Sequence, residues 1–265
     1  MYYDMHTHSQ FSTDSHMTME TALESALDKN LSGIAFTDHL DIDFTNREDE
    51  YQFDVSAYFT YINKIIDSYS GKIDILKAVE FGIQEHVIEE TKARIAGFDY
   101  DFILGSTHLY HRLDPYEPEF YANNRPKVEM YTDCLACIYK NIQLYNDFDV
   151  LAHIDYHVRK APYSDPAFYY SECADITDEI LKFIVDKGIG FEINTSTYKV
   201  AALDTMLLKR YHELGGEIVT IGSDAHYAGN VAQLFPKYLE IIKNCGFDYV
   251  AHYKARKPVF DKIDI

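Results

Sequence analysis

The chain has 265 residues, of which 47% are hydrophobic, and it carries a formal net charge of −19 at pH 7. So acidic a chain opposes nonspecific binding to nucleic acid and to anionic membranes, because phosphate groups recruit basic surfaces. No apolar run approaches the roughly 20 residues of a transmembrane helix, and we expect no signal peptide. Four cysteines in a chain without a signal peptide predict reduced thiols in a cytoplasmic protein.

Short β-prone apolar runs alternate with longer amphipathic segments along the chain. The runs that predict strands are residues 2–6, 33–39, 73–82, 101–108, 148–155, 188–196 and 217–226. The segments that predict helices are residues 18–29, 55–69, 85–96, 127–146, 175–186, 203–214 and 229–244. This alternation predicts parallel strands joined by right-handed crossovers, in an open doubly wound sheet or a closed barrel. Without a linker or low-complexity tract, we expect one domain over residues 1–265.

Cys134 and Cys137 form a C-x-x-C pair inside the fourth predicted helix. Such a pair occurs in zinc and redox sites, but a four-cysteine zinc site needs a second pair, and the sequence has none. The surrounding segment, "VEMYTDCLACIYKNIQLY", has the apolar spacing of a helix. We therefore expect both cysteines to pack in the core.

Potential metal ligands lie at the carboxyl end of every predicted strand. They are His6 and His8, Asp38 and His39, Glu80, His108, His153 and Asp155, Glu192 and Asn194, and Asp224 and His226. In a closed barrel these ends meet at one mouth, where barrel enzymes keep their active sites. An open sheet would spread them along an edge, with a site only at its switch point. The distribution favours a barrel, with seven units rather than eight.

Six histidines at strand ends, together with Asp14, Glu80 and Asp224, predict a metal cluster. A lone histidine is more often a structural residue, but crowded carboxylates repel unless cations or protons lie between them. Imidazole mixed with carboxylate suits zinc, iron or manganese better than calcium or magnesium. Two such ions about 3.5–4 Å apart can deliver hydroxide near neutral pH and clamp a phosphoryl group. A cationic mouth of this kind would let an acidic protein bind a phosphate ester.

"HTHS" after the first strand, "TDH" at the second, a Glu on the third, "GSTH", "HID" and the final "SDAH" resemble the motifs of the PHP (polymerase and histidinol phosphatase) superfamily. The match runs in order from residue 4 to residue 226, and the length resembles that of the stand-alone histidinol-phosphate phosphatase branch. The resemblance implies an α/β fold, a distorted seven-stranded (β/α)7 TIM-like barrel, with two to three divalent transition metal ions.

The resemblance also implies a ligand set, carried over residue by residue. His6, His8, Glu80 and Asp224 would hold one ion, Glu80 would bridge to a second held by His108 and His153, and Asp14, His39 and His226 would hold a third. Asp38 would orient a ligand rather than bind metal. His16 would lie outside the cluster.

Two basic residues are the candidates for phosphate binding. Arg159 in "HIDYHVRK" falls where related phosphatases place an arginine, which suits bidentate phosphate contact. Lys199 in "NTSTYK" falls where they often carry a basic residue, although Thr197 and Tyr198 depart from the small residues expected there.

The implied reaction is hydrolysis of a phosphomonoester by a metal-bridging hydroxide, with Asp224 able to shuttle the proton. The resemblance points to L-histidinol phosphate, a step in histidine synthesis, and Asp41 or Asp43 would suit its cationic groups. Two alternatives stay open. One is a PHP phosphoesterase acting on a nucleotide or sugar phosphate, and the other is a non-catalytic metal-binding barrel.

Overall fold

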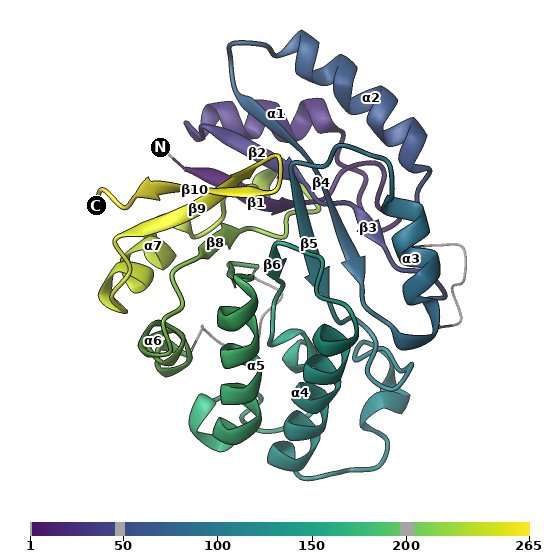
Figure 1. The fold of residues 1–265 in the computed structure, drawn as a ribbon, viewed down its shortest axis with the longest axis vertical. Coiled ribbons are helices and arrows are strands. Elements are labelled where there is room, and N and C mark those ends of the chain that lie inside the picture. The colour runs from purple at the N-terminus through teal and green to yellow at the C-terminus, as the bar shows by residue number, and fades with distance from the viewer. Residues whose placement is uncertain (1, 46–50, 197–203) are drawn as a thin grey trace.

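The computed structural model describes residues 2–45, 51–196 and 204–265. Its main sheet is parallel, in the order β1 (Tyr3–Thr7), β2 (Gly33–Phe36), β4 (Asp74–Gly82), β5 (Phe102–Ser106), β6 (Val150–Leu151), β7 (Gly190–Asn194) and β8 (Val219–Gly222), and the short β3 (His39–Leu40) also pairs with β4. The end of β8 meets β1, where His8 N–H donates to Ala225 C=O at 2.9 Å and Asp224 N–H to His6 C=O at 2.8 Å. The sheet thus curves into a nearly closed barrel (Figure 1), as predicted.

Seven α-helices of the described residues surround this barrel (Figure 1). They are α1 (Met19–Asp28), α2 (Val55–Ser68), α3 (Ile88–Ile95), α4 (Lys127–Leu144), α5 (Ala174–Lys187), α6 (Thr205–Glu213) and α7 (Phe235–Asn244). Thr18, Asp54 and Asp204 cap three of them by accepting backbone N–H groups in the first turn. No helix within the described ranges is long and apolar enough to cross a membrane.

The last helix is shorter than predicted. The apolar spacing suggested residues 229–244, but α7 begins at Phe235, and residues 228–230 form a separate 3-10 turn. Leu234 has a left-handed backbone (φ 60°) and Pro236 lies at the first turn. Both features favour a helix start at this point, because proline fits the first turn and breaks a helix interior.

The cysteine pair lies on α4, as expected. Cys134 is buried in the main hydrophobic cluster and Cys137 packs against it. Both thiols are free. Burial raises the pKa of each thiol, which is the opposite of what a reactive or metal-binding thiolate requires.

The barrel interior has an apolar layer at its amino end and a polar layer at its carboxyl end. The apolar layer contains Met5, Leu76, Ala78, Phe102 and Leu104. Inward positions alternate along each strand, so β4 passes from Leu76 and Ala78 in the apolar layer to Glu80 in the polar one. The strands that form the apolar layer therefore also carry the polar side chains of the candidate site.

A β-bulge in β1 aims both histidines of "HTH" into the polar layer. Asp4 pairs with Ile34 and Thr7 pairs with Phe36, so Met5 and His6 together face one residue of β2. Up to the first residue of the bulge the inward side chains are Tyr3 and Met5, which belong to the interior apolar cluster. From its second residue onward they are His6 and His8, whose Nε2 atoms lie 3.0 Å apart.

An antiparallel hairpin of β9 (Tyr249–Lys254) and β10 (Lys257–Lys262) follows the barrel and was not predicted. Its turn places Ala255 and Arg256 at positive φ (47° and 62°). Such turns usually carry Asn-Gly, and the sequence has no such signal here. The guanidinium of Arg256 contacts both carboxylate oxygens of Asp149 at 2.9 Å, just before β6. The hairpin thus covers the amino end of the barrel, away from the polar layer.

Candidate metal centre

Glu80 is the fully buried centre of a cluster that contains all nine predicted ligands. Its Oε2 lies 3.3 Å from His6 Nε2, 3.6 Å from His8 Nε2 and 3.1 Å from His39 Nδ1. Its Oε1 lies 3.1 Å from His108 Nε2 and 2.7 Å from His153 Nε2. Residues from β1, β3, β4 and the ends of β5 and β6 thus meet around one carboxylate.

Two further carboxylates flank this centre. Asp224 Oδ1 lies 3.2 Å from His8 Nε2 and 3.6 Å from His6 Nε2. Asp14, on the loop after β1, places Oδ2 3.2 Å from His226 Nε2 and 3.6 Å from His39 Nε2. The three predicted ligand groups are therefore each close together. His16 is exposed and outside the cluster.

Hydrogen bonds fix which nitrogen of His6 and His8 faces the cluster. His6 Nδ1 lies 2.5 Å from Glu192 Oε1, a carboxylate that can only accept. His8 Nδ1 lies 3.0 Å from Ser12 Oγ, whose own proton goes to Asp38 Oδ1 at 2.7 Å. Both Nδ1 atoms therefore donate, so that each ring, when it is neutral, points an unprotonated Nε2 inward.

The same arrangement recurs at His108 and His226. His108 Nδ1 donates to Asp41 Oδ1 at 2.9 Å, and His226 Nδ1 donates to the Asp224 carbonyl at 3.0 Å. This corrects the expectation for Asp41, which is buried under a histidine rather than placed on a loop to meet a substrate. Asp43 contacts His86 at 2.7 Å and Arg112 at 2.9 Å near the surface, and does not line the mouth cavity.

These tautomers make the cluster a fit for cations. The lone pairs of His6 Nε2 and His8 Nε2 face each other at 3.0 Å, with Glu80 and Asp224 oxygens beside them. Lone pairs and carboxylates this close repel unless positive charge lies between them. Four sets of three donor atoms, each within 4.8 Å of one another, occur here. Mixed imidazole and carboxylate donors suit zinc, iron or manganese.

Protons on the imidazole rings are the other source of positive charge between these carboxylates. Burial alone would raise the pKa of Glu80, but His6, His108 and His39 outweigh it and hold the pKa well below its usual range. Burial alone would lower the pKa of His6, but the carboxylates of Glu192, Glu80 and Asp224 raise it well above its ordinary value. The acidic side chains of the cluster thus stay ionised because positive charge is close to them.

Arg159 is half-buried at the edge of the cluster, directly after a 3-10 turn (Tyr156–Val158), and its side chain is 7% exposed. Its Nη2 donates to Asp224 Oδ2 at 2.6 Å, and its guanidinium lies 4.6 Å from the centre of the Tyr156 ring. Its Nε has no hydrogen-bond partner among the described residues. Arg159 therefore lies beside the predicted metal ligands with a free donor, and its contact with phosphate stays a prediction. Lys199 lies outside the described residues.

A cavity of about 310 Å³ opens above the cluster. Six of the predicted ligands line it together with two basic residues, Arg159 and Lys160. The rest of the lining is Phe44, Tyr51, Asp114, Tyr116, Tyr156 and Tyr227. A larger cavity of about 840 Å³ lies beside the hairpin turn, but its lining contains no histidine. The chemistry of the lining therefore identifies the smaller cavity as the site.

Sequence reasoning left several supporting residues without a role. Glu192 was recognised as an acid at a strand end, and Asp41 as a loop acid, but neither was paired with a histidine. Ser12 gave no signal, since a serine in a loop is typical of a surface turn. Only the fold brings these residues next to the Nδ1 atoms of the histidines, which face away from the cluster.

Comparison with known proteins agrees with this geometry. The sequence profile of the PHP domain matches residues 4–196. A Clostridium acetobutylicum protein named "Probable histidinol-phosphatase" is 38% identical over 263 residues, covering 98% of this chain and 96% of that protein. The "Histidinol-phosphatase" of Lactococcus lactis subsp. lactis is 30% identical, covering 96% of this chain and 95% of that protein.

Solved structures give the same result. The crystal structure of histidinol phosphate phosphatase from Lactococcus lactis subsp. lactis, in complex with zinc, L-histidinol and phosphate, has a TM-score of 0.89 and 28% identity, and the match covers 98% of this chain and 99% of that one. A structure from Listeria monocytogenes has a TM-score of 0.73 at 15% identity, covering 89% of this chain and 99% of that one, and shows the fold alone.

Proposed function

Since the chain belongs to the PHP domain family, we propose that it is a single-domain, metal-dependent phosphomonoester hydrolase acting on L-histidinol phosphate. The observation that carries the proposal is the convergence of nine imidazole and carboxylate side chains, with Arg159 beside them, at the mouth of the barrel. Support for the substrate comes from the names of the relatives and from the L-histidinol and phosphate in the Lactococcus lactis structure.

The donor groups would hold two to three divalent ions, zinc, iron or manganese. His6, His8, Glu80 and Asp224 would hold one, Glu80, His108 and His153 a second, and Asp14, His39 and His226 a third. Bound ions would supply an activated water near neutral pH and neutralise charge on the phosphoryl oxygens.

Arg159 and Asp224 would act on the phosphate and on the proton. A phosphate group entering the cavity gives the Arg159 guanidinium a second anionic partner, and its unpaired Nε is an available donor. Burial alone would raise the pKa of Asp224, but Arg159 and His6 hold the pKa well below its usual range. Asp224 is therefore ionised and has an acceptor oxygen to offer, but a pKa this low makes it a weak base. The shuttle role thus requires that its pKa rise once phosphate engages Arg159.

The remaining lining of the cavity suits the alcohol part of L-histidinol phosphate. It has five aromatic rings, and Asp114 adds a carboxylate that is only 7% exposed. Arg159 and Lys160 already lie near the rings of Tyr156 and Tyr116. The other three aromatic faces and the Asp114 carboxylate are the groups that favour a cationic amine and an imidazole. At about 310 Å³ the cavity is near the lower end for ligand pockets, which favours a small ester over a nucleotide.

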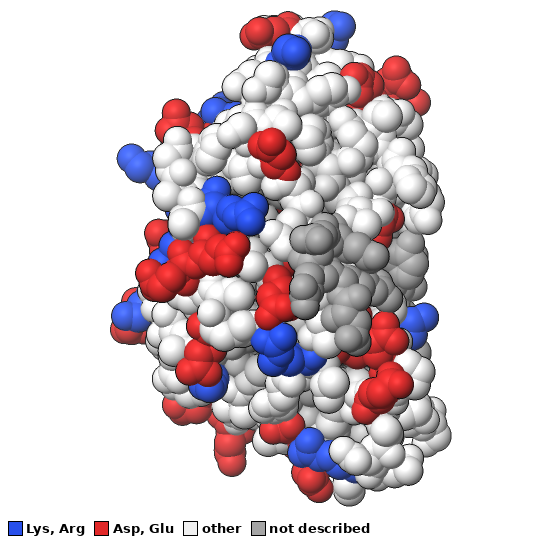
Figure 2. All heavy atoms as spheres, turned by 90° about the vertical axis from the view of Figure 1, so that its right-hand side faces the viewer, with Lys and Arg blue, Asp and Glu red and all other residues white. Residues whose placement is uncertain are grey.

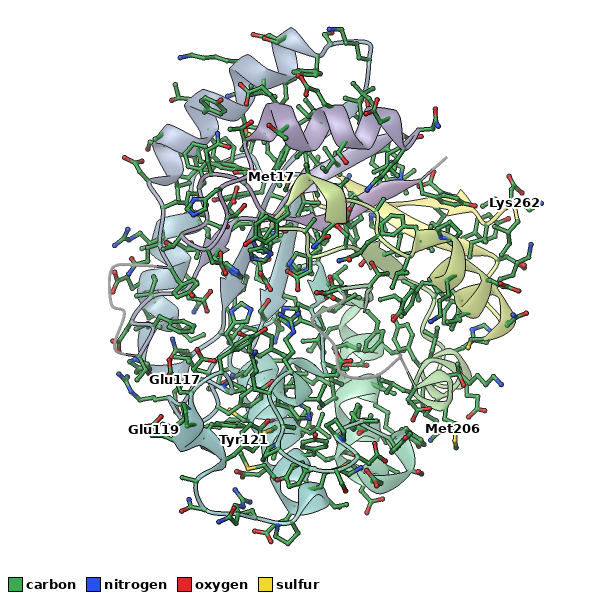
Figure 3. All side chains as sticks on the ribbon, turned by 180° about the vertical axis from the view of Figure 1, so that it is seen from behind. Met17, Glu117, Glu119, Tyr121, Met206 and Lys262 are labelled. Atoms are coloured by element: carbon green, nitrogen blue, oxygen red, sulfur yellow. The ribbon has the colours of Figure 1, made fainter. Side chains whose placement is uncertain are left out.

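One face of the molecule has no concentrated positive charge among its described residues. Figure 2 shows that Lys and Arg side chains lie among Asp and Glu on this face. Figure 3 shows Glu117, Glu119 and Tyr121, from the segment between β5 and α4, on the side of the molecule away from Lys262 at the end of the hairpin. We expect a phosphate ester to be bound by charge inside the mouth, where Arg159 and the proposed ions lie.

Phosphate release from a panel of esters tests the proposal. Enzyme of known metal content is assayed with L-histidinol phosphate, a nucleoside monophosphate and a sugar phosphate, and the highest kcat/KM is expected for L-histidinol phosphate. A preference for the nucleotide or the sugar phosphate would reject only the substrate. No release from any ester, with metal bound, would reject the enzyme and leave a non-catalytic metal-binding barrel.

A further inference from the structure

Glu192 on β7 contacts two of the proposed ligand residues at once, although it belongs to neither ligand set. Its Oε1 lies 2.5 Å from His6 Nδ1, and its Oε2 accepts the backbone N–H of His153 at 2.7 Å. The side chain amide of Asn194 also reaches Oε2, at 3.4 Å. Glu192 is 3% exposed, so water cannot replace these contacts.

Gly222 allows this contact across the barrel seam. It lies on β8, which pairs with β7 and ends beside β1. A Cβ at this position would come within 2.4 Å of His6 Cβ and 2.9 Å of Glu192 Oε1. Any side chain here would therefore separate His6 from Glu192, and the glycine leaves the space in which they meet.

Two properties of His6 and His153 depend on Glu192. As an acceptor at Nδ1, the carboxylate keeps the His6 proton there and leaves Nε2 free to bind a cation. As an acceptor of the His153 N–H, it holds the backbone from which that imidazole reaches Glu80 at 2.7 Å. His6 belongs to the first proposed ion and His153 to the second.

We propose that Glu192 is a positioning residue that sets the affinity of the first two metal sites together. It selects the metal-binding tautomer of His6 and ties the backbone of His153 to the same carboxylate. The inference rests on the metal-dependent function proposed above, and extends it to a residue that touches neither ion nor substrate.

A carboxylate is required because both of its oxygens accept a hydrogen bond. Glutamine has nearly the same shape but offers one acceptor and one donor. In Glu192→Gln, either His6 Nδ1 or the His153 N–H must face an NH₂ group. If it is His6, the ring can satisfy that group only by moving its proton to Nε2, which removes a metal ligand.

Thr220→Val supplies a matched control. Thr220 pairs in register with Glu192 on the neighbouring strand, it is buried, and its hydroxyl has no hydrogen-bond partner among the described residues. Valine has nearly the same shape, so this variant changes a buried residue beside Glu192 and leaves the hydrogen bonds of Glu192 to His6 and His153 in place.

The experiment is equilibrium dialysis of chelator-treated protein against buffered Zn²⁺, with bound zinc measured by mass spectrometry. In Glu192→Gln the affinity for two of the bound zinc ions is expected to fall by roughly 10–100-fold. This is the range typical when a metal-binding histidine loses its hydrogen-bond partner. Thr220→Val is expected to match wild type. Thermal unfolding of the metal-free proteins should be similar for all three, and excess Zn²⁺ should restore turnover to Glu192→Gln, as a folding defect would not allow.

Wild-type zinc affinity in Glu192→Gln would overturn the assignment. Should that variant fail to fold, nitrogen NMR of zinc-loaded wild type with labelled histidine decides instead. A proton on His6 Nδ1 with zinc at Nε2 supports the inference, and the reverse overturns it. Wild-type protein that binds no zinc, iron or manganese would refute the proposed function as well.

Discussion

His157 is a buried histidine whose protonation is expected to destabilise the fold, and His157→Phe tests this. The ring is fully buried, and neither ring nitrogen has a hydrogen-bond partner among the described residues. Tyr131, Tyr110 and Phe168 surround it, with ring centres 4.6, 5.8 and 6.0 Å away. The residue lies two positions before Arg159, so its state bears on the turn that carries the proposed phosphate contact.

The size of the effect follows from the pKa. Burial lowers the pKa of His157 from 6.5 to about 4, and Asp155 offsets this only in part. A depressed pKa means that the unfolded chain takes up the proton first, so stability is intact above pH 6.5 and is lost as the pH falls towards 4. The linkage relation gives a loss of about 2 kcal/mol between pH 7 and pH 5, and about 3 kcal/mol in full.

Urea unfolding followed by circular dichroism, at pH 7 and at pH 5 with equal zinc, measures this loss. The free energy of unfolding of wild type should fall by about 2 kcal/mol more than that of His157→Phe over this range. A packing difference between His157 and Phe changes the free energy of unfolding by the same amount at both pH values, so it cancels in the comparison. His16→Phe, at an exposed position, is the control. Equal pH dependence in wild type and His157→Phe would refute the reasoning.

Four further changes test the site and the fold. His153→Ala should remove one zinc, measured by mass spectrometry, and abolish phosphate release; wild-type activity would refute its assignment. Arg159→Met should keep its zinc but lower kcat/KM by about 10²–10³, since a group that stabilises transition-state charge is lost, and an unchanged value would place Arg159 outside the reaction. Asp114→Asn keeps an acceptor for the Tyr116 N–H (2.8 Å), so the local structure should stay intact. Because the negative charge is lost, KM for L-histidinol phosphate should rise about tenfold, the equivalent of one charge-assisted hydrogen bond. KM for phenyl phosphate should not change, and equal effects on both esters would contradict amine recognition. Arg256→Ala should lower the free energy of unfolding by about 1–2 kcal/mol in a urea titration, because Asp149 loses a charged partner, with kcat unchanged; a lower kcat would show that the hairpin acts on the site.

The fold was predictable where hydrophobic periodicity and strand–helix alternation are strong. The seven main strands and seven helices all occur near their predicted positions, because each buries a regular apolar face. The hairpin of β9 and β10 was missed, since its turn at Ala255 and Arg256 carries no glycine or asparagine. Its stabilising contacts, such as Arg256 with Asp149, join residues more than a hundred positions apart.

The candidate site was predictable as a set of residues but not as a geometry. Parallel strand ends must share one edge of a barrel, so the spacing of His6, His108 and Asp224 along the chain was sufficient to bring them together. The bulge at Met5 and His6 could not be read from the sequence, because it depends on how β1 pairs with β2. Without it, the alternation that buries Met5 would turn His6 away from the cluster.

The acidic charge of the chain and its proposed anionic substrate are compatible because the buried carboxylates serve two separate purposes. Glu80 and Asp224 face inward, where they would hold cations. Glu192, Asp41 and Asp38 lie behind the histidines, where they hold ring protons directly or through Ser12. A phosphate in the cavity would meet the bound ions and Arg159 rather than the carboxylates behind them. Removing Glu192, Asp41 or Asp38 would therefore weaken phosphate binding, because the histidines would hold the ions less well. This would happen although the protein becomes less negative.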